Sequence, residues 1–168
     1  MEVGFATGGR AGSGGEVAPG MDDVIQRWNE AGIRYLLVGG QALRLLGMPR
    51  FTMDWDFFIP GRDPDNFQRL NELLEEDLDE PLVPLGPMGE NFVQTYQTRY
   101  GILQFHLGLP GVPRFDDAEA RARPCLTETG IPVRCLSLDD LLAAKTAAGR
   151  PQDQMDIAFL EELRRALG

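Results

Sequence analysis

The chain has 168 residues and a formal net charge of −10, with 43% apolar and 25% charged residues, proportions typical of a globular domain with a hydrophobic core. No apolar run approaches the ~18 residues of a membrane span, and the N-terminus lacks the basic and apolar segments of a secretion signal, so we expect a cytoplasmic protein. The single histidine excludes multi-histidine zinc sites, and the acidic charge without basic patches argues against binding of duplex DNA by the chain itself.

Residues 1–20 contain seven glycines and little that forms a core, so they predict a flexible Gly-rich tail. Residues 21–168 then form a single domain, whose elements follow from hydrophobic periodicity and turn residues. Helices are predicted over 22–31, 41–47, 64–76, 115–121, 137–148 and 151–166, and strands over 33–38, 51–59, 91–98, 101–109, 124–128 and 131–136. This order predicts an α+β domain of mixed α/β character, with a mixed β-sheet flanked by helices and with helices at the C-terminus.

Two features of the chain have competing interpretations. Cys125 and Cys135 lie on either side of a predicted turn, where they form either a redox pair or two small buried hydrophobic side chains. A cytoplasmic location favours the second interpretation. Six acidic residues crowd into 72–80, which we interpret as a solvated helix end and loop, with a partner-binding patch as the alternative.

A glycine pair, Gly39-Gly40, ends the predicted strand at 33–38 and opens the next helix. Glycine lets the backbone approach a ligand closely, and the free N–H groups of a helix start favour an anion. The pair alone is a weak signal, because an ordinary turn uses the same residues.

Two acids on the next predicted strand sharpen that signal. Asp54 and Asp56 point to the same face of a strand, with Cα atoms about 6.6 Å apart, a spacing at which two carboxylates converge on divalent ions. Their neighbours Met53, Trp55 and Phe57 are expected in the core. Placing acids on so apolar a strand costs folding free energy unless they contact a cation, a hydrogen-bond donor or water.

The stretches Gly39-Gly40-Gln41-Ala42 and Arg50-Phe51-Thr52-Met53-Asp54-Trp55-Asp56 resemble the signature of the nucleotidyltransferase superfamily, which has a polymerase-beta-like fold. The closer resemblance is to its branch of bacterial minimal nucleotidyltransferases, which includes toxins of abortive-infection and toxin–antitoxin systems. The stretch 137–156 is similar to that branch as well, at Lys145, Arg150, Asp153 and Asp156. The resemblance covers most of residues 24–160.

The resemblance implies Mg²⁺-dependent (or Mn²⁺-dependent) transfer of a nucleoside monophosphate from a nucleoside triphosphate. Asp54 and Asp56 would hold the metal, Gly39-Gly40 would receive phosphate oxygens, and Lys145 would supply a point charge to the triphosphate.

Other residues near the motif have a structural alternative. Lys145 lies at the edge of an apolar helix face, where a lysine often covers core. Arg50 and Thr52 share the face of Asp54 and either contact phosphate or hold the aspartates in place. We expect Asp153 to answer a helix dipole, and Asp156 to bond to Lys145 or Arg150 rather than to metal.

One position departs from the family pattern. The family usually has a third acid on a later strand, and here that position falls on Gln104, which cannot act as a general base and binds Mg²⁺ weakly. His106 lies on the same face two residues on and is a candidate base, although a histidine satisfied by hydrogen bonds is the favoured interpretation.

Three hypotheses remain for function. The first is an enzyme that transfers a nucleoside monophosphate to a hydroxyl on RNA, a protein or a small molecule. The second is a catalytically degenerate module that binds a nucleotide or a protein, in a toxin–antitoxin pair with an antitoxin-like partner. The third is a structural domain in which Asp54 and Asp56 have no ligand.

Overall fold

The computed structural model describes residues 20–168. The tail predicted over residues 1–20 therefore lies outside the described residues except for Gly20, which caps the first helix. The helices are α1 (Met21–Glu30), α2 (Gly39–Leu45), α3 (Pro64–Leu73), α4 (Phe115–Ala120), α5 (Leu138–Ala148), the 3-10 turn η2 (Pro151–Asp153) and α6 (Gln154–Leu167). The strands are β1 (Leu36–Val38), β2 (Asp54–Phe58), β3 (Val93–Thr98), β4 (Gly101–His106), β5 (Arg123–Leu126) and β6 (Pro132–Cys135).

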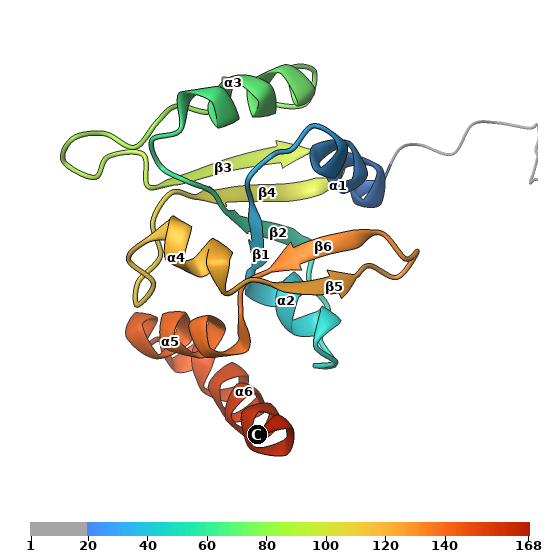
Figure 1. The fold of residues 1–168 in the computed structure, drawn as a ribbon, viewed down its shortest axis with the longest axis vertical. Coiled ribbons are helices and arrows are strands. Elements are labelled where there is room, and N and C mark those ends of the chain that lie inside the picture. Colours follow the sequence, from blue (N-terminus) through green and yellow to red (C-terminus); the bar gives the residue numbers. More distant parts are fainter. Residues whose placement is uncertain (1–19) are drawn as a thin grey trace, which may run out of the picture.

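The strands form one mixed six-stranded sheet in the order β3-β4-β2-β1-β6-β5 (Figure 1). β1 runs antiparallel to β2 and parallel to β6, and β2 runs parallel to β4. The outer pairs, β3 with β4 and β5 with β6, are antiparallel hairpins. The predicted mixed sheet flanked by helices is confirmed.

The two faces of the sheet differ in character. On the core face, Trp28 of α1 contacts Phe57 of β2 edge-to-face at 4.8 Å between ring centroids, and α3 buries Phe67 and Leu70. The opposite face carries Asp54 and Asp56, and we call it the acid face. Phe115 of α4 covers its far end by packing on Phe58. The aromatic cluster thus fixes the side of β2 that is left for polar chemistry.

Several predicted boundaries are too wide. β2 begins at Asp54 rather than at residue 51, because Arg50 and Thr52 pack against Gly40 instead of continuing the ladder. Met53 is therefore 64% exposed, so its predicted place in the core is wrong. No helix in residues 20–168 is long and apolar enough to cross a membrane.

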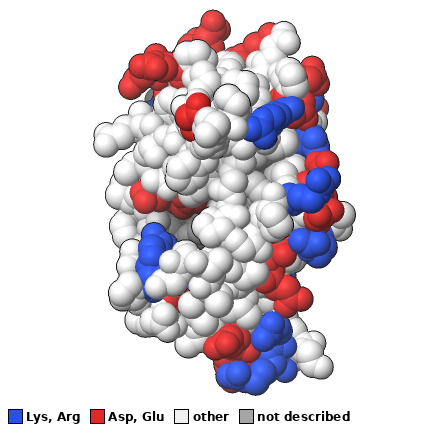
Figure 2. All heavy atoms as spheres, turned by 90° about the vertical axis from the view of Figure 1, so that its left-hand side faces the viewer, with Lys and Arg blue, Asp and Glu red and all other residues white. Residues whose placement is uncertain are grey.

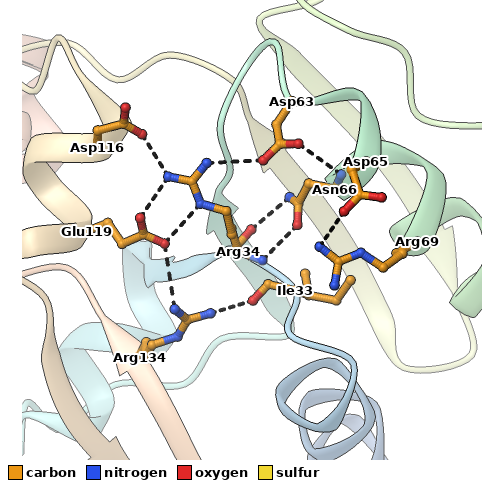
Figure 3. A network of polar contacts seen from close by, with 9 residues as sticks. All are labelled: Ile33, Arg34, Asp63, Asp65, Asn66, Arg69, Asp116, Glu119 and Arg134. Carbon is orange, nitrogen blue, oxygen red and sulfur yellow. Dashed lines mark hydrogen bonds and ion pairs between the residues drawn. The ribbon is translucent and has the colours of Figure 1, made fainter.

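A polar network anchors β1 at the end opposite Gly39 (Figure 3). Arg34, which precedes β1, donates to Asp63 at the start of α3 and to Asp116 and Glu119 of α4. Glu119 also pairs with Arg134 of β6. Hydrogen bonds to Glu119 and then to Asp116 and Asp63 raise the pKa of Arg34 above its usual value. One guanidinium therefore joins three separate elements.

Replacing Arg34 with glutamine should lower the free energy of unfolding by about 2 kcal/mol, because it leaves three carboxylates close together without their shared cation. Chemical denaturation measures the change. Arg114→Gln is the matched control, since Arg114 is exposed and, among residues 20–168, forms an ion pair only with Asp117, at 3.3 Å. Equal losses in the two variants would contradict a structural role for the network.

Candidate active site

The glycine turn and the acid pair meet at the junction of β1 and α2. Gly39 adopts a φ of +69°, and a Cβ placed there would lie 2.5 Å from Oδ2 of Asp56. Any side chain at residue 39 would therefore displace this carboxylate, and the positive φ disfavours one as well. The backbone corner and the acid are in direct contact, as the sequence interpretation requires.

The second glycine is enclosed by the segment that leads into β2. A Cβ on Gly40 would lie 3.2 Å from Cγ2 of Thr52 and 3.5 Å from Nε of Arg50. Thr52 in turn accepts a hydrogen bond at Oγ1 from the backbone N–H of Asp54, at 3.1 Å. Arg50 and Thr52 therefore hold the start of β2 against the helix.

Neighbouring strands complete the acid face. Asp56 pairs with Val38 of β1 on one side and with Gln104 of β4 on the other. His106 is two residues further along β4, and its Nε2 lies 3.0 Å from Oδ1 of Asp56. The structure thus brings Asp56, Gln104 and His106 together, and His106 is satisfied by a hydrogen bond to the candidate metal-binding acid itself. Within residues 20–168, neither Asp54 nor Asp56 pairs with an arginine or lysine.

A cluster of basic and acidic side chains joins the glycine turn to the C-terminal helices. Arg50 donates to both carboxylate oxygens of Asp156, at 2.8 and 2.9 Å. Lys145 of α5 lies 3.0 Å from Asp156 and 3.3 Å from Asp153. Arg150 makes two hydrogen bonds to Asp153, both at 2.9 Å. The cluster holds η2 and α6 against the segment that precedes β2.

This cluster refines two sequence predictions. Asp156 does bond to Lys145, but its second partner is Arg50 rather than Arg150. Asp153 does stand at the start of α6, as predicted, but it is 1% exposed and its carboxylate is the partner of two cations, Arg150 and Lys145. The pairing of Arg50 with Asp156 spans 106 residues, and no local pattern in the sequence indicates it.

The charges of the cluster shift the pKa values of its members, and the Asp56 charge on the acid face contributes to one of these shifts. Hydrogen bonds from Arg150 and the nearby charge of Lys145 lower the pKa of Asp153 to about 2, against the opposing effect of burial. The pKa of Arg150 is raised chiefly by Asp153, with smaller contributions from Asp156 and Asp56. Arg150 is therefore close enough to Asp56 to feel its charge.

The acid pair fits a metal ion that arrives with its substrate. No group of three or more His, Cys, Asp or Glu side chains able to hold a metal occurs in the part of the chain that the structure describes. Mg²⁺ is usually bound through one or two carboxylates together with substrate phosphates rather than in an all-protein cage. Two carboxylates beside a bare glycine corner match that mode.

A cleft of about 480 Å³ lies elsewhere, at the far end of β1 and β2. Arg34 and Asp63, which line it, are already engaged in the network of Figure 3. We therefore interpret this cleft as a structural feature of the fold and not as the active site.

Sequence comparison identifies the family. Residues 25–166 match the family described as nucleotidyl transferase AbiEii toxin, type IV toxin–antitoxin system. The chain belongs to this family. A comparison with curated protein sequences gives no match.

Solved structures of nucleotidyltransferases share the fold of this AbiEii-family chain. The lincosamide antibiotic adenylyltransferase LnuA, bound to lincomycin, superposes with a TM-score of 0.56 at 18% identity, over 82% of this chain and 92% of its own. TM1012 of Thermotoga maritima, described as a candidate nucleotidyltransferase, gives 0.55 at 13% identity over 88% and 89%. ANT(2'')-Ia, in complex with adenylyl-2''-tobramycin, gives 0.54 at 17% identity over 88% and 87%. At these identities the likeness establishes the fold.

Gly39→Ala should lower the free energy of unfolding by about 2–3 kcal/mol, because it combines backbone strain with displacement of Asp56. Gly47→Ala is the matched control, since Gly47 has a φ of +104° with open space where its Cβ would lie, so that strain acts there alone. Thermal and chemical denaturation measure both. If Gly47→Ala lowered the free energy of unfolding as much as Gly39→Ala, the contact between residue 39 and Asp56 would have no energetic consequence.

Asp153→Asn should lower the free energy of unfolding by about 2 kcal/mol at neutral pH. This figure follows from the pKa of the Asp153 carboxyl, which is about 2 in the folded state and 3.8 in the unfolded state. Because the folded pKa is depressed, the contribution is complete above about pH 4 and is lost as the pH falls towards 2. Denaturation curves of wild type and variant should therefore converge in acid. A difference that is independent of pH would show that the charge of Asp153 is not what stabilises the fold.

Proposed function

We propose that this AbiEii-family chain is a Mg²⁺-dependent nucleotidyltransferase, which moves a nucleoside monophosphate from a nucleoside triphosphate to a hydroxyl acceptor. The observation that carries the proposal is the contact between the Asp56 carboxylate and the Gly39 backbone. It places a candidate metal ligand beside a corner that has no side chain, where a phosphate can approach. Family membership supports the same chemistry.

In the proposed site, Asp54 and Asp56 hold Mg²⁺ or Mn²⁺ together with the triphosphate. The bound ion supplies neutralisation of phosphate charge and a lowered pKa for the acceptor hydroxyl. Gly39 and Gly40 admit phosphate oxygens close to the backbone. Lys145 and Arg50 provide positive charge at the edge of the site, although both are already paired with Asp156.

Gln104 and His106 determine how the acceptor proton leaves. Gln104 occupies the position where the family resemblance expects a third acid, directly beside Asp56, and an amide does not take a proton. His106 contacts Asp56 at 3.0 Å and is the remaining candidate base. It also positions the Asp56 carboxylate, and this second role does not depend on proton transfer. Nucleotidyl transfer relies mainly on positioning and charge stabilisation, so the site can act with a weak base.

The acceptor class is open among RNA, protein and small-molecule hydroxyls. LnuA and ANT(2'')-Ia are named for antibiotic substrates, which supports a small molecule, whereas the family description supports a toxin with a cognate antitoxin partner. We expect both toxin and partner to be cytoplasmic.

Incubation with α-labelled nucleoside triphosphates and Mg²⁺ or Mn²⁺ tests the proposal, with total tRNA, the protein itself and an aminoglycoside as acceptors. Wild type should transfer label, and Asp54→Asn and Asp56→Asn should each reduce the rate at least about 10³-fold, since both carboxylates hold the ion. Glu162→Gln, an exposed substitution on α6, should leave the rate unchanged. Transfer by the wild type that equals that of Asp54→Asn would contradict the assignment of the site.

Gln104 supports a second function, a catalytically degenerate module that binds a nucleotide without transferring it. In that case the triphosphate with Mg²⁺ should raise the melting temperature of the wild type with no transfer of label, and Gln104→Asp should create activity. Restoring a base is worth a factor of about 10²–10⁴. A wild type as active as Gln104→Asp would exclude this alternative.

A further inference from the structure

The edge strand β3 is unusually open for the edge of a sheet. It pairs only with β4 (Figure 1), and its sequence, Val-Gln-Thr-Tyr-Gln-Thr, contains no charged residue and no proline. Proteins normally protect exposed edges with lysine, proline, bulges or a covering element. The opposite edge, β5, carries both Arg123 and Pro124. Within residues 20–168, the protection is thus present at one edge of this sheet and absent at the other.

The hydrogen-bond phase shows which groups of β3 face outward. The N–H of Leu107 donates to the carbonyl of Phe92 at 2.7 Å, and the register pairs Val93 with His106. Inward-bonding residues alternate along an antiparallel ladder, so Val93, Thr95 and Gln97 turn their backbone N–H and C=O groups away from β4. Within residues 20–168, these outward groups have no hydrogen-bond partner.

We propose that this edge is a docking site for an extended, basic segment of a partner protein, which adds to the sheet as a seventh strand. Backbone hydrogen bonds to an exposed edge give such complexes their affinity, and side-chain pockets give their specificity. Here the edge of β3 supplies the backbone hydrogen bonds, and the residues at the two ends of the strand supply the side-chain specificity.

The start of the strand offers an apolar anchor. Met88, Phe92 and Val93 are 87%, 58% and 37% exposed. The loop that carries Met88 is held in shape by Glu90, whose carboxylate accepts from the N–H of Met88 at 2.6 Å and whose carbonyl accepts from the N–H of Gly86 at 2.9 Å. Because the loop is fixed by these bonds, its apolar residues are presented at little further cost in entropy.

The other end of the strand selects the charge of the partner. A recess of about 250 Å³ is lined by Glu76, Asp77, Gln97, Thr98 and Arg99. Arg99 neutralises Asp77 at 3.0 Å but leaves Glu76 free among the residues that the structure describes. Exposed acids Glu75, Asp79 and Glu80 adjoin Glu76 and Asp77 in the chain, and acidic side chains also lie at the top of the face drawn in Figure 2. They favour a basic segment, and they disfavour a second copy of this acidic chain or a nucleic acid.

The position of the edge places a docked strand near the acid face. Val93, Thr95 and Gln97 pair with His106, Gln104 and Ile102 and so share their face of the sheet. β3 lies two strands from β2, so a strand docked on β3 would lie three strands from β2, about 14 Å away. A partner strand held here would extend the acid face of the sheet beyond β3, whether or not the candidate active site is catalytic.

The probe is a capped octapeptide of alternating lysine and valine, and the control is its glutamate–valine counterpart. Fluorescence anisotropy should show at least about tenfold tighter binding of the lysine peptide, weakened by added salt. Hydrogen exchange should slow at the amides of Val93, Thr95 and Gln97, with those of Gln94 and Tyr96 unchanged because they already bond to β4.

Thr95→Pro removes one outward N–H without removing a bond to β4 and should weaken binding at least about tenfold. Glu76→Lys changes only exposed charge and should weaken binding of the lysine peptide while leaving the melting temperature near that of the wild type. No binding, equal binding of both peptides, or protection of amides away from β3 would overturn the proposal. So would dimerisation of the chain through β3, or displacement of the peptide by single-stranded RNA. The measurements contain no nucleotide triphosphate, so they do not depend on the proposed transferase activity.

Discussion

The contact between the Asp56 carboxylate and the Gly39 backbone is the constraint on which the site depends. Gly39 has no side chain and a positive φ, so the end of β1 turns into α2 while the acid of the neighbouring strand remains against the turn. The core face makes the contact possible, because Trp28, Phe57 and Phe105 fix the side of β2 that faces the interior. With that side buried, Asp54 and Asp56 have only the opposite face.

The ion-pair cluster extends this constraint to the C-terminal helices. Asp156 accepts from Arg50 and pairs with Lys145, while Asp153 holds Lys145 and Arg150. Two buried acids thus hold three cations in one cluster, of which Arg50 lies beside Gly40. If the proposed function holds, this partial neutralisation suits the release of product, since fully unpaired cations would hold the product as well as the triphosphate.

The local patterns of the sequence predict most of the elements and the central motif. The strand–glycine–helix junction, the acid pair on β2 and the position of Gln104 beside Asp56 all follow from period-two alternation and from resemblance to the family. Boundaries are less well predicted. Residues 51–53 are predicted as strand, yet the strand begins at Asp54, Thr52 lies against Gly40 of α2, and Met53 is exposed. Side-chain partners are also decided beyond the local sequence: at the start of α5, Ser137 accepts from the N–H of Asp140, while the Asp140 carboxylate accepts from Arg121, 19 residues earlier in the chain.

The sequence by itself determined which residues are candidates for chemistry, because glycines at a helix start and paired acids on an apolar strand are local features that can be recognised without the fold. Only the tertiary structure decided what those residues touch. The bond between His106 and Asp56, the pairing of Arg50 with Asp156 across 106 residues and the open edge of β3 all depend on strand order and on helix placement. These depend on how the whole core packs, and no short stretch of sequence encodes them.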